Sequence, residues 1–110
     1  AMAPVLQRVA NVLMSSPGTI VVEGHTDSQP ISTERFRSNW DLSTARAASV
    51  VTELLQYAPI GDDRVVVQGH SDTKPVAPND TAENRAKNRR VEIHIIGDNG
   101  SETTLSVPLQ

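Results

Sequence analysis

The sequence has no cysteine, few aromatic residues and no long apolar segment. Without cysteine, the chain can form no disulfide framework, no thiolate zinc site and no cysteine nucleophile. Only 3% of its residues are Phe, Trp or Tyr, so the core must be built from Val, Ile, Leu and Ala. No apolar run approaches the roughly 20 residues that a membrane-spanning helix needs. The 110 residues therefore fit a single aliphatic domain with one modest core.

The sequence also lacks an excess of basic residues. Its 10 Lys and Arg are outnumbered by 13 Asp and Glu, which gives a net charge of −3 at pH 7. A general nucleic-acid-binding protein needs a surplus of Lys and Arg to displace the counterions around the phosphates. We therefore expect no nucleic-acid partner. No signal peptide is visible, and the opening letters AMAP resemble the approach to a helix, so we expect a targeting or membrane segment upstream.

One motif occurs twice in the sequence. IVVEGHTDSQPI begins at Ile20 and VVVQGHSDTKPV begins at Val65, and the two stretches are identical at six of twelve positions. Each predicts a buried strand that ends at a glycine and continues into Gly-His-(Thr/Ser)-Asp. A helix predicted over about 42–57 separates the two strands. Such a strand–helix–strand unit forms a right-handed crossover with parallel strands.

Apolar periodicity predicts helices and strands in alternation along the rest of the chain. An N-terminal helix is expected to bury Val5, Val9, Val12 and Leu13. The central helix is expected to bury Ala47, Ala48, Val51, Leu54, Leu55 and Ala58. A short helix is expected over TAENRAKN, with Asp80 and Glu83 at the spacing of a capping box. A last strand alternates at Val91, Ile93 and Ile95.

These elements predict an α+β fold in which helices cover one face of a small mixed sheet. We divide the chain into an N-terminal helix at 1–17, a main domain at 18–97 and a C-terminal segment at 98–110. That last segment is expected to be either a loose tail or an edge strand.

The parallel strands place Asp27 and Asp72 at the same edge of the sheet, where ligands gather in such units. After the first motif, Leu42 and Arg46 form a stripe one turn long at the start of the central helix, separate from its core side. Asp27 and Arg46 can then face one pocket and hold a zwitterion, such as the head group of an α-amino acid. The alternative is that the two side chains neutralise each other. We expect one main site at the first motif, with the second motif as a scaffold.

The ordered segments GHTD, NWDLSTARAASVVTELL, GHSDTKP and NRAKNRRVEI resemble the OmpA-like peptidoglycan-binding domain. The resemblance covers about 21–95. The segments SQPISTERFRSNWDLS and PNDTAENRAKNRRVEI look most like the periplasmic C-terminal domain of the flagellar stator subunits MotB and PomB. The separation of Asp27 from Arg46 is several residues longer than in the outer-membrane members.

The resemblance implies a βαβαβ sandwich that binds peptidoglycan through the diaminopimelate of its peptide stem, without catalysis. It also implies a homodimer, a membrane-embedded stator partner reached through a missing N-terminal segment, and a periplasmic location in a Gram-negative inner-membrane protein. The same domain in an outer-membrane protein or lipoprotein, or in a type VI secretion subunit, is the alternative. Carried over residue by residue, the ligand-binding positions are Thr26, Asp27, Asn39, Leu42, Arg46 and Arg89.

Two further interpretations of the repeated motif compete with this one. His25 and His70, with Asp27 and Asp72, have the chemistry of a metal cluster and of a metal-dependent hydrolase. The spacing His-x-Asp fixes no geometry, however, and no serine of the motifs lies on a nucleophile elbow. We therefore expect no metal, no cofactor and no catalytic residue. Each histidine is instead expected to pack at a strand end and to hydrogen-bond to loop backbone.

Overall fold

The two copies of the motif lie side by side as parallel strands. The computed structural model describes residues 3–109. In it, β1 (Thr19–His25) pairs with β2 (Val65–Gly69) in parallel, with Ile20 opposite Val65 and Gly24 opposite Gly69. The C-terminal ends of both strands therefore lie at the same edge of the sheet, as predicted.

Two further strands complete a four-stranded sheet in the order β2-β1-β3-β4. Both β3 (Arg90–Ile96) and β4 (Glu102–Pro108) run antiparallel to their neighbours, so the sheet is mixed. The C-terminal segment thus forms an edge strand. The helices are α1 (Ala3–Met14), α2 (Asn39–Tyr57) and α3 (Ala82–Asn88), with a 3-10 turn at Asp62–Arg64. The predicted α+β fold, with its βαβαβ order from β1 to β3, is confirmed.

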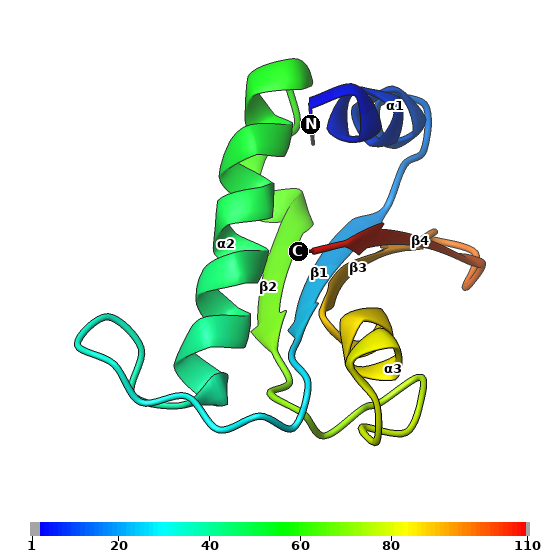
Figure 1. Ribbon diagram of the computed structural model, residues 1–110. Helices are drawn as coiled ribbons and strands as arrows, with labels where there is room; N and C mark the ends of the chain where they lie inside the picture. The colour runs from blue at the N-terminus through cyan, green and yellow to red at the C-terminus, as the bar shows by residue number, and fades with distance from the viewer. Residues whose placement is uncertain (1–2, 110) are drawn as a thin grey trace.

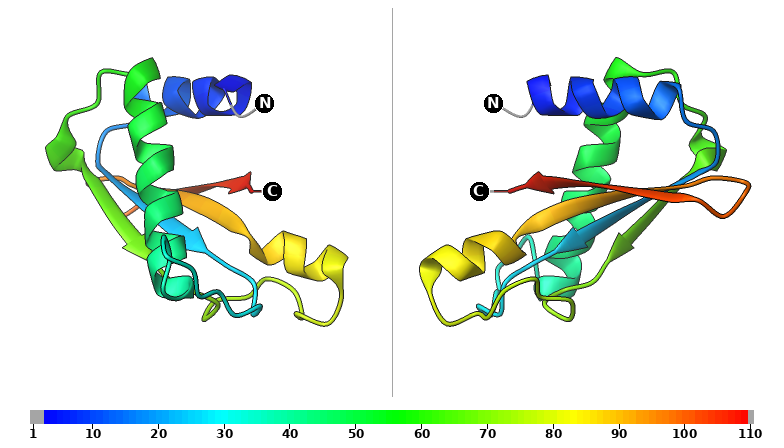
Figure 2. Two further views of the ribbon diagram at one scale, coloured as in Figure 1. Left: turned by 60° about the vertical axis from the view of Figure 1, so that its left-hand side comes forward. Right: turned by 90° about the vertical axis from the view of Figure 1, so that its right-hand side faces the viewer.

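The helices are arranged unevenly around this sheet (Figures 1 and 2). α2 lies along one face, α1 packs against α2, and α3 lies beyond the end of the sheet next to the loops that follow β1 and β2. The core fills the space between the sheet, α1 and α2, and is aliphatic throughout. Over residues 3–109, no helix is both long and apolar enough to cross a membrane.

Two helix faces differ from the sequence-based expectation. In α1 the buried stripe is Leu6, Val9, Ala10 and Leu13, whereas Val5 and Val12 are each 38% exposed. In α2, Val50 is buried and Ala48 is exposed. In both helices the observed buried stripe is rotated by about one residue from the predicted one. Apolar periodicity shows that a helix has a buried face, but it locates the centre of that face less well.

The start of α3 also differs from prediction. Thr81, not Asp80, is the N-cap, and its hydroxyl accepts a hydrogen bond from the backbone N–H of Asn84 at 3.0 Å. The Asp80 carboxylate instead accepts a bond from the Asn84 side chain at 2.9 Å. The cap therefore lies one residue later in the chain than the sequence pattern indicated.

Close packing of α2 on the strand ends positions the candidate site. A Cβ on Gly24 would collide with the backbone carbonyl of Ser43, and a Cβ on Gly69 would collide with the Thr44 hydroxyl. Glycine at the end of each motif strand therefore allows the N-terminal half of α2 to approach the sheet. This contact places the first turns of α2 directly beside the loop that follows β1.

Candidate ligand-binding site

Asp27 and Arg89 form the central ion pair of the sheet edge. Asp27 lies two residues after the end of β1, and Arg89 lies between α3 and β3. The Nη1 atom of Arg89 is 2.6 Å from Oδ2 of Asp27, and the other carboxylate oxygen accepts the backbone N–H of Gln29 at 3.0 Å. The Asp27 side chain is 10% exposed and that of Arg89 is 30% exposed. The acid is therefore held in place by a charge and by its own loop.

Hydrogen bonds from neighbouring residues fix the loop around Asp27. The hydroxyl of buried Thr26 donates to the Asp27 carbonyl at 2.9 Å, and its backbone N–H donates to the Ser71 carbonyl at 2.9 Å. The side-chain amide of Asn39, the first residue of α2, donates to the Gln29 carbonyl at 3.0 Å. The loop is thus tied both to the second motif and to the start of α2.

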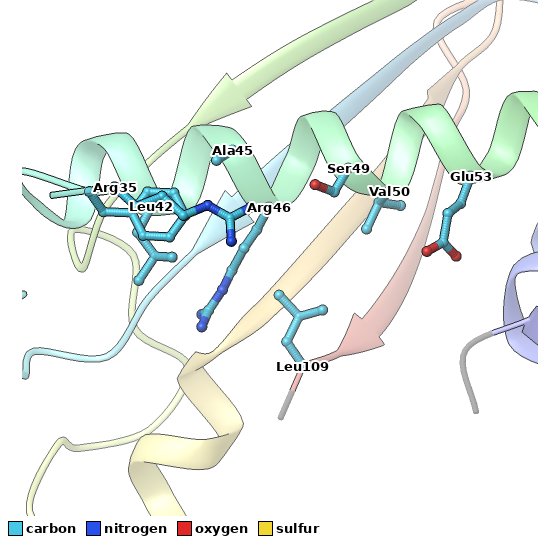
Figure 3. A pocket seen from close by; sticks show the side chains of 9 residues that line it. Arg35, Leu42, Ala45, Arg46, Ser49, Val50, Glu53 and Leu109 are labelled. Atoms are coloured by element: carbon cyan, nitrogen blue, oxygen red, sulfur yellow. The ribbon is translucent and has the colours of Figure 1, made fainter. Parts of the chain in front are cut away.

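A pocket of about 310 Å³ opens beside this network (Figure 3). Leu42, Arg46, Val50 and Glu53 of α2 line it along one side, and Leu109, just after β4, lies opposite. Figure 3 shows the Arg46 side chain extending from α2 toward the junction of α3 and β3. The full lining is Arg35, Phe36, Leu42, Ala45, Arg46, Ser49, Val50, Glu53 and Leu109.

Arg46 is the unusual group in this pocket. Its Nη1 atom is buried and has no hydrogen-bond partner among residues 3–109. Burial lowers the pKa of Arg46, and the nearby Arg89 charge lowers it further, while Asp27 acts in the opposite direction. Arginine nonetheless stays charged in proteins. The pocket wall therefore carries a cationic side chain with an unsatisfied N–H group among residues 3–109, which is suited to an anionic group.

The predicted site residues fall into two adjoining groups. Leu42 and Arg46 line the pocket, whereas the other four belong to the hydrogen-bonded edge beside it, namely Thr26, Asp27, Asn39 and Arg89. Arg46 joins the groups, since Asp27 and Arg89 are the charges that most affect it. The alternative expected from the sequence was an ion pair between Asp27 and Arg46. In the structure, Asp27 pairs with Arg89 instead.

The second motif has a different local structure from the first. Ser71 has a left-handed φ of 56°, and its backbone N–H donates to the buried Ser43 hydroxyl at 3.0 Å. Asp72 is exposed and lies outside the network around Asp27. The four-residue grouping of His25, His70, Asp27 and Asp72 does not form, because Asp27 faces Arg89 rather than the histidines.

Sequence reasoning missed several contributors to the site. Asn88 is fully buried, and its amide bonds to the backbone of Val76 and Ala77 and to the Asn79 side chain. Asn79 in turn accepts the backbone N–H of Ser28. Leu109 reaches the pocket because its N–H donates to the Arg89 carbonyl at 3.1 Å. Only the position of Asn88 next to Arg89 in the NRR triplet could have drawn attention to it.

The structure is thus an α+β sandwich whose pocket lies between α2 and the residue that follows β4, next to the charged edge at Asp27 and Arg89. The chain belongs to the OmpA family, whose model matches residues 1–89. It is 39% identical over 101 residues to motility protein B of Bacillus subtilis, covering 91% of this chain and 39% of that protein. The chain therefore spans about two fifths of that relative.

Solved structures agree with this assignment. The C-terminal domain of Helicobacter pylori MotB matches with a TM-score of 0.77 and 37% identity, over 84% of this chain and 70% of that one. The cell wall anchor of the type VI secretion system from Pseudomonas aeruginosa matches with a TM-score of 0.74 and 41% identity, over 97% of this chain and 66% of that one. The fold and the resemblance to MotB-type domains are thus confirmed.

Proposed function

We propose that this domain binds peptidoglycan non-catalytically, through the diaminopimelate of the peptide stem, and thereby anchors a flagellar stator to the cell wall. The observation that carries the proposal is the Arg46 guanidinium, whose buried Nη1 atom has no hydrogen-bond partner among residues 3–109, in a pocket next to Asp27 and Arg89. The similar proteins support it, since two are motility proteins and a third is described as a cell wall anchor.

The chemistry of the ligand fits the charges of the site. The free end of a stem diaminopimelate carries one ammonium and one carboxylate. The carboxylate can accept two parallel hydrogen bonds from Arg46. The ammonium can donate to Asp27, because each carboxylate oxygen has two acceptor sites and each accepts a single bond in the structure. Leu42 and Leu109 then flank the methylene chain, and a volume of about 310 Å³ suits a small ligand.

Retention on insoluble peptidoglycan tests the role of Arg46. We expect Arg46→Ala to weaken binding by about 2–5 kcal/mol, because the bound carboxylate loses its charged partner. The matched control is Arg8→Ala, which removes the same charge from an exposed position on α1. Equal retention of the wild type and Arg46→Ala would place the binding site elsewhere.

Competition with soluble ligands tests the zwitterion itself. Diaminopimelate and pimelate have the same carbon chain and carboxylates, and only the former carries amines. If Asp27 binds the ammonium, diaminopimelate displaces the domain from peptidoglycan at a much lower concentration than pimelate. Asp27→Asn should remove that difference. Equal competition by the two acids would mean that the site binds only the carboxylate, and it would exclude the role proposed for Asp27.

The setting of the domain is part of the proposal. We place it in the periplasm of a Gram-negative bacterium, as the C-terminal part of an inner-membrane stator subunit that dimerises and assembles with a membrane-embedded partner. A type VI secretion subunit is the second candidate, because the Pseudomonas anchor matches over 97% of this chain. A single upstream membrane helix bearing an aspartate would favour the stator, and a lipoprotein signal would exclude it. Sedimentation of the domain tests the homodimer.

A further inference from the structure

All three histidines of the chain lie on the face of the sheet that α1 and α2 leave uncovered. In β1, Glu23 and His25 alternate with the core residues Ile20 and Val22. In β3, Glu92 and His94 alternate with Val91, Ile93 and Ile95 in the same way. His70 follows β2 and stacks on His25, with ring centroids 5.2 Å apart and planes 15° apart. This open face is separate from the pocket at Arg46.

The imidazoles converge on one carboxylate oxygen. Oε1 of Glu23 lies 3.3 Å from Nε2 of His70 and 3.5 Å from the Nε2 atoms of His25 and His94. The Nε2 atom of His94 is also 3.2 Å from Oε1 of Glu92. In tetrahedral zinc sites with bonds of 2.0–2.2 Å, neighbouring ligand atoms are roughly 3.3 Å apart. The three distances measured from Glu23 are therefore close to the separation of two ligand atoms on one metal ion.

A tighter group lies within this cluster. One ligand atom each from Glu23, His25 and Glu92 can be chosen so that all three lie within 4.8 Å of one another. His25 is 1% exposed, and neither of its ring nitrogens has a hydrogen-bond partner among residues 3–109. Buried polar groups in proteins are nearly always hydrogen-bonded. A metal–nitrogen bond would satisfy one of these atoms.

Further charged groups hold these side chains in place from behind. Nδ1 of His94 lies 3.0 Å from a carboxylate oxygen of Glu102, and such carboxylate–histidine contacts orient metal-bound imidazoles. Arg90 donates to Oε2 of Glu92 at 2.5 Å, which leaves Oε1 of that carboxylate toward the cluster. The Arg90 charge opposes a nearby cation, but Glu23, Glu92 and Glu102 supply three negative charges against it.

We propose that Glu23, His25 and Glu92 bind one divalent transition-metal ion of the zinc class, with His94, whose Nε2 atom lies 3.5 Å from Glu23 and 3.2 Å from Glu92, as the fourth ligand. Two imidazoles and two carboxylates match the borderline ligand preference of zinc, whereas magnesium and calcium prefer oxygen ligands alone. Four protein ligands make a closed site, which is typical of structural zinc. The ion joins β1 to β3 on the open face. The site differs from the expectation that the chain holds no metal, and it does not depend on the proposed function.

Zinc binding by the chelator-treated domain, prepared without a histidine tag, tests this site. Isothermal titration with zinc should give one ion per chain, and cobalt should give the strong visible absorption of tetrahedral coordination. We expect Glu23→Gln and His25→Gln each to weaken zinc binding at least tenfold. Glu92→Gln, whose side chain is 19% exposed, is the second variant if the buried His25→Gln fails to fold.

His70→Gln is the matched control. It removes the histidine that stacks on His25 and lies 3.3 Å from Glu23, but whose Nε2 atom is also 3.1 Å from Oε1 of Gln68 and which lies outside the close group of Glu23, His25 and Glu92, so binding should stay within about threefold of the wild type. Absence of saturable binding at one ion per chain would overturn the site. Equal affinity in the wild type, Glu23→Gln and Glu92→Gln would overturn it as well. A loss in His70→Gln as large as that in His25→Gln would disprove the proposed ligand set.

Discussion

Arg89 and Asp27 are 62 residues apart in the chain and form an ion pair of 2.6 Å. The pair joins the loop after β1 to the start of β3, and so it closes the edge at which both motifs end. Because its partner is Arg89, Asp27 leaves the Arg46 guanidinium unpartnered within residues 3–109. A fixed acid and an unpaired arginine therefore lie next to each other. This arrangement differs both from a neutral Asp27–Arg46 pair and from two free charges.

The Asp27–Arg89 pair is expected to stabilise the fold measurably. A double-mutant cycle with Asp27→Ala, Arg89→Ala and the double variant should give a coupling of about 1–3 kcal/mol. The coupling energy should not exceed this range, because the Arg89 side chain is 30% exposed and solvent screens its charge. Urea unfolding measures the free energies. Combining Asp27→Ala with Arg8→Ala is the control and should show no coupling. A coupling below about 0.3 kcal/mol for the first cycle would contradict the ion pair.

Arg46 is expected to behave in the opposite way. Its guanidinium is partly desolvated and its Nη1 atom has no hydrogen bond within the described part of the chain, so it contributes little favourable energy to the folded state. Arg46→Met should therefore leave the free energy of unfolding within about 0.5 kcal/mol or raise it. Arg89→Met should lower it by about 1–3 kcal/mol, because Asp27 loses its partner. Urea unfolding of the two variants gives the comparison. Equal destabilisation would mean that Arg46 has a structural role after all.

Short sequence patterns predicted the helices and strands well, because each helix or strand is specified mainly by residues that are close together in the chain. The repeated strands, the crossover helix and the parallel pairing all follow from short apolar runs and from chirality. The centre of each helix face is a property of the packed molecule. Val5 and Val12 satisfy the period of α1 as well as Leu6 and Ala10 do, and only contact with α2 and the sheet distinguishes the two faces.

The charged contacts could not be predicted from the sequence, because they too depend on how distant segments of the chain pack together. The partner of Asp27 depends on where β3 begins, and the pocket wall at Leu109 depends on the pairing of β4. The histidine-rich face depends on the register that sets Glu23 opposite Glu92 and His25 opposite Arg90. Alternation within β3 indicated one polar face, but it could not indicate which polar groups from β1 meet it.

Asn88 is expected to be essential for the loop that supports the site. Its Oδ1 atom accepts the N–H groups of Val76 and Ala77 at 2.8 and 3.1 Å, and its Nδ2 atom donates to the Ala77 carbonyl and to Asn79. Asn88→Ala leaves these groups unpaired in a fully buried position and should cost at least about 2 kcal/mol. Thermal or urea unfolding measures the loss. Asn99→Ala, at an exposed turn, is the control and should cost less than about 1 kcal/mol.

His25 makes the stability of the metal-free domain depend on pH. Burial, followed by the charge of Arg90, lowers the pKa of His25 from 6.5 to about 4; His70 also lowers it, whereas Glu92 and Glu23 act in the opposite direction. Between pH 6.5 and about 4, His25 is protonated in the unfolded chain but stays neutral in the folded chain. Stability is therefore complete above pH 6.5 and falls as the pH decreases toward 4, by up to about 1.4 kcal/mol per pH unit.

Urea unfolding between pH 7.5 and 5.5, in the presence of a chelator, measures this dependence. The wild type should lose about 1 kcal/mol more than His25→Gln over that interval, because the variant has no imidazole to protonate at this position. The remaining histidines, His70 and His94, are present in both proteins, so their contribution cancels in the difference to first order. Parallel curves for the two proteins would mean that His25 titrates alike in the folded and unfolded states. In that case the imidazole would be accessible to water in the folded protein, which would contradict its burial without hydrogen-bond partners among residues 3–109.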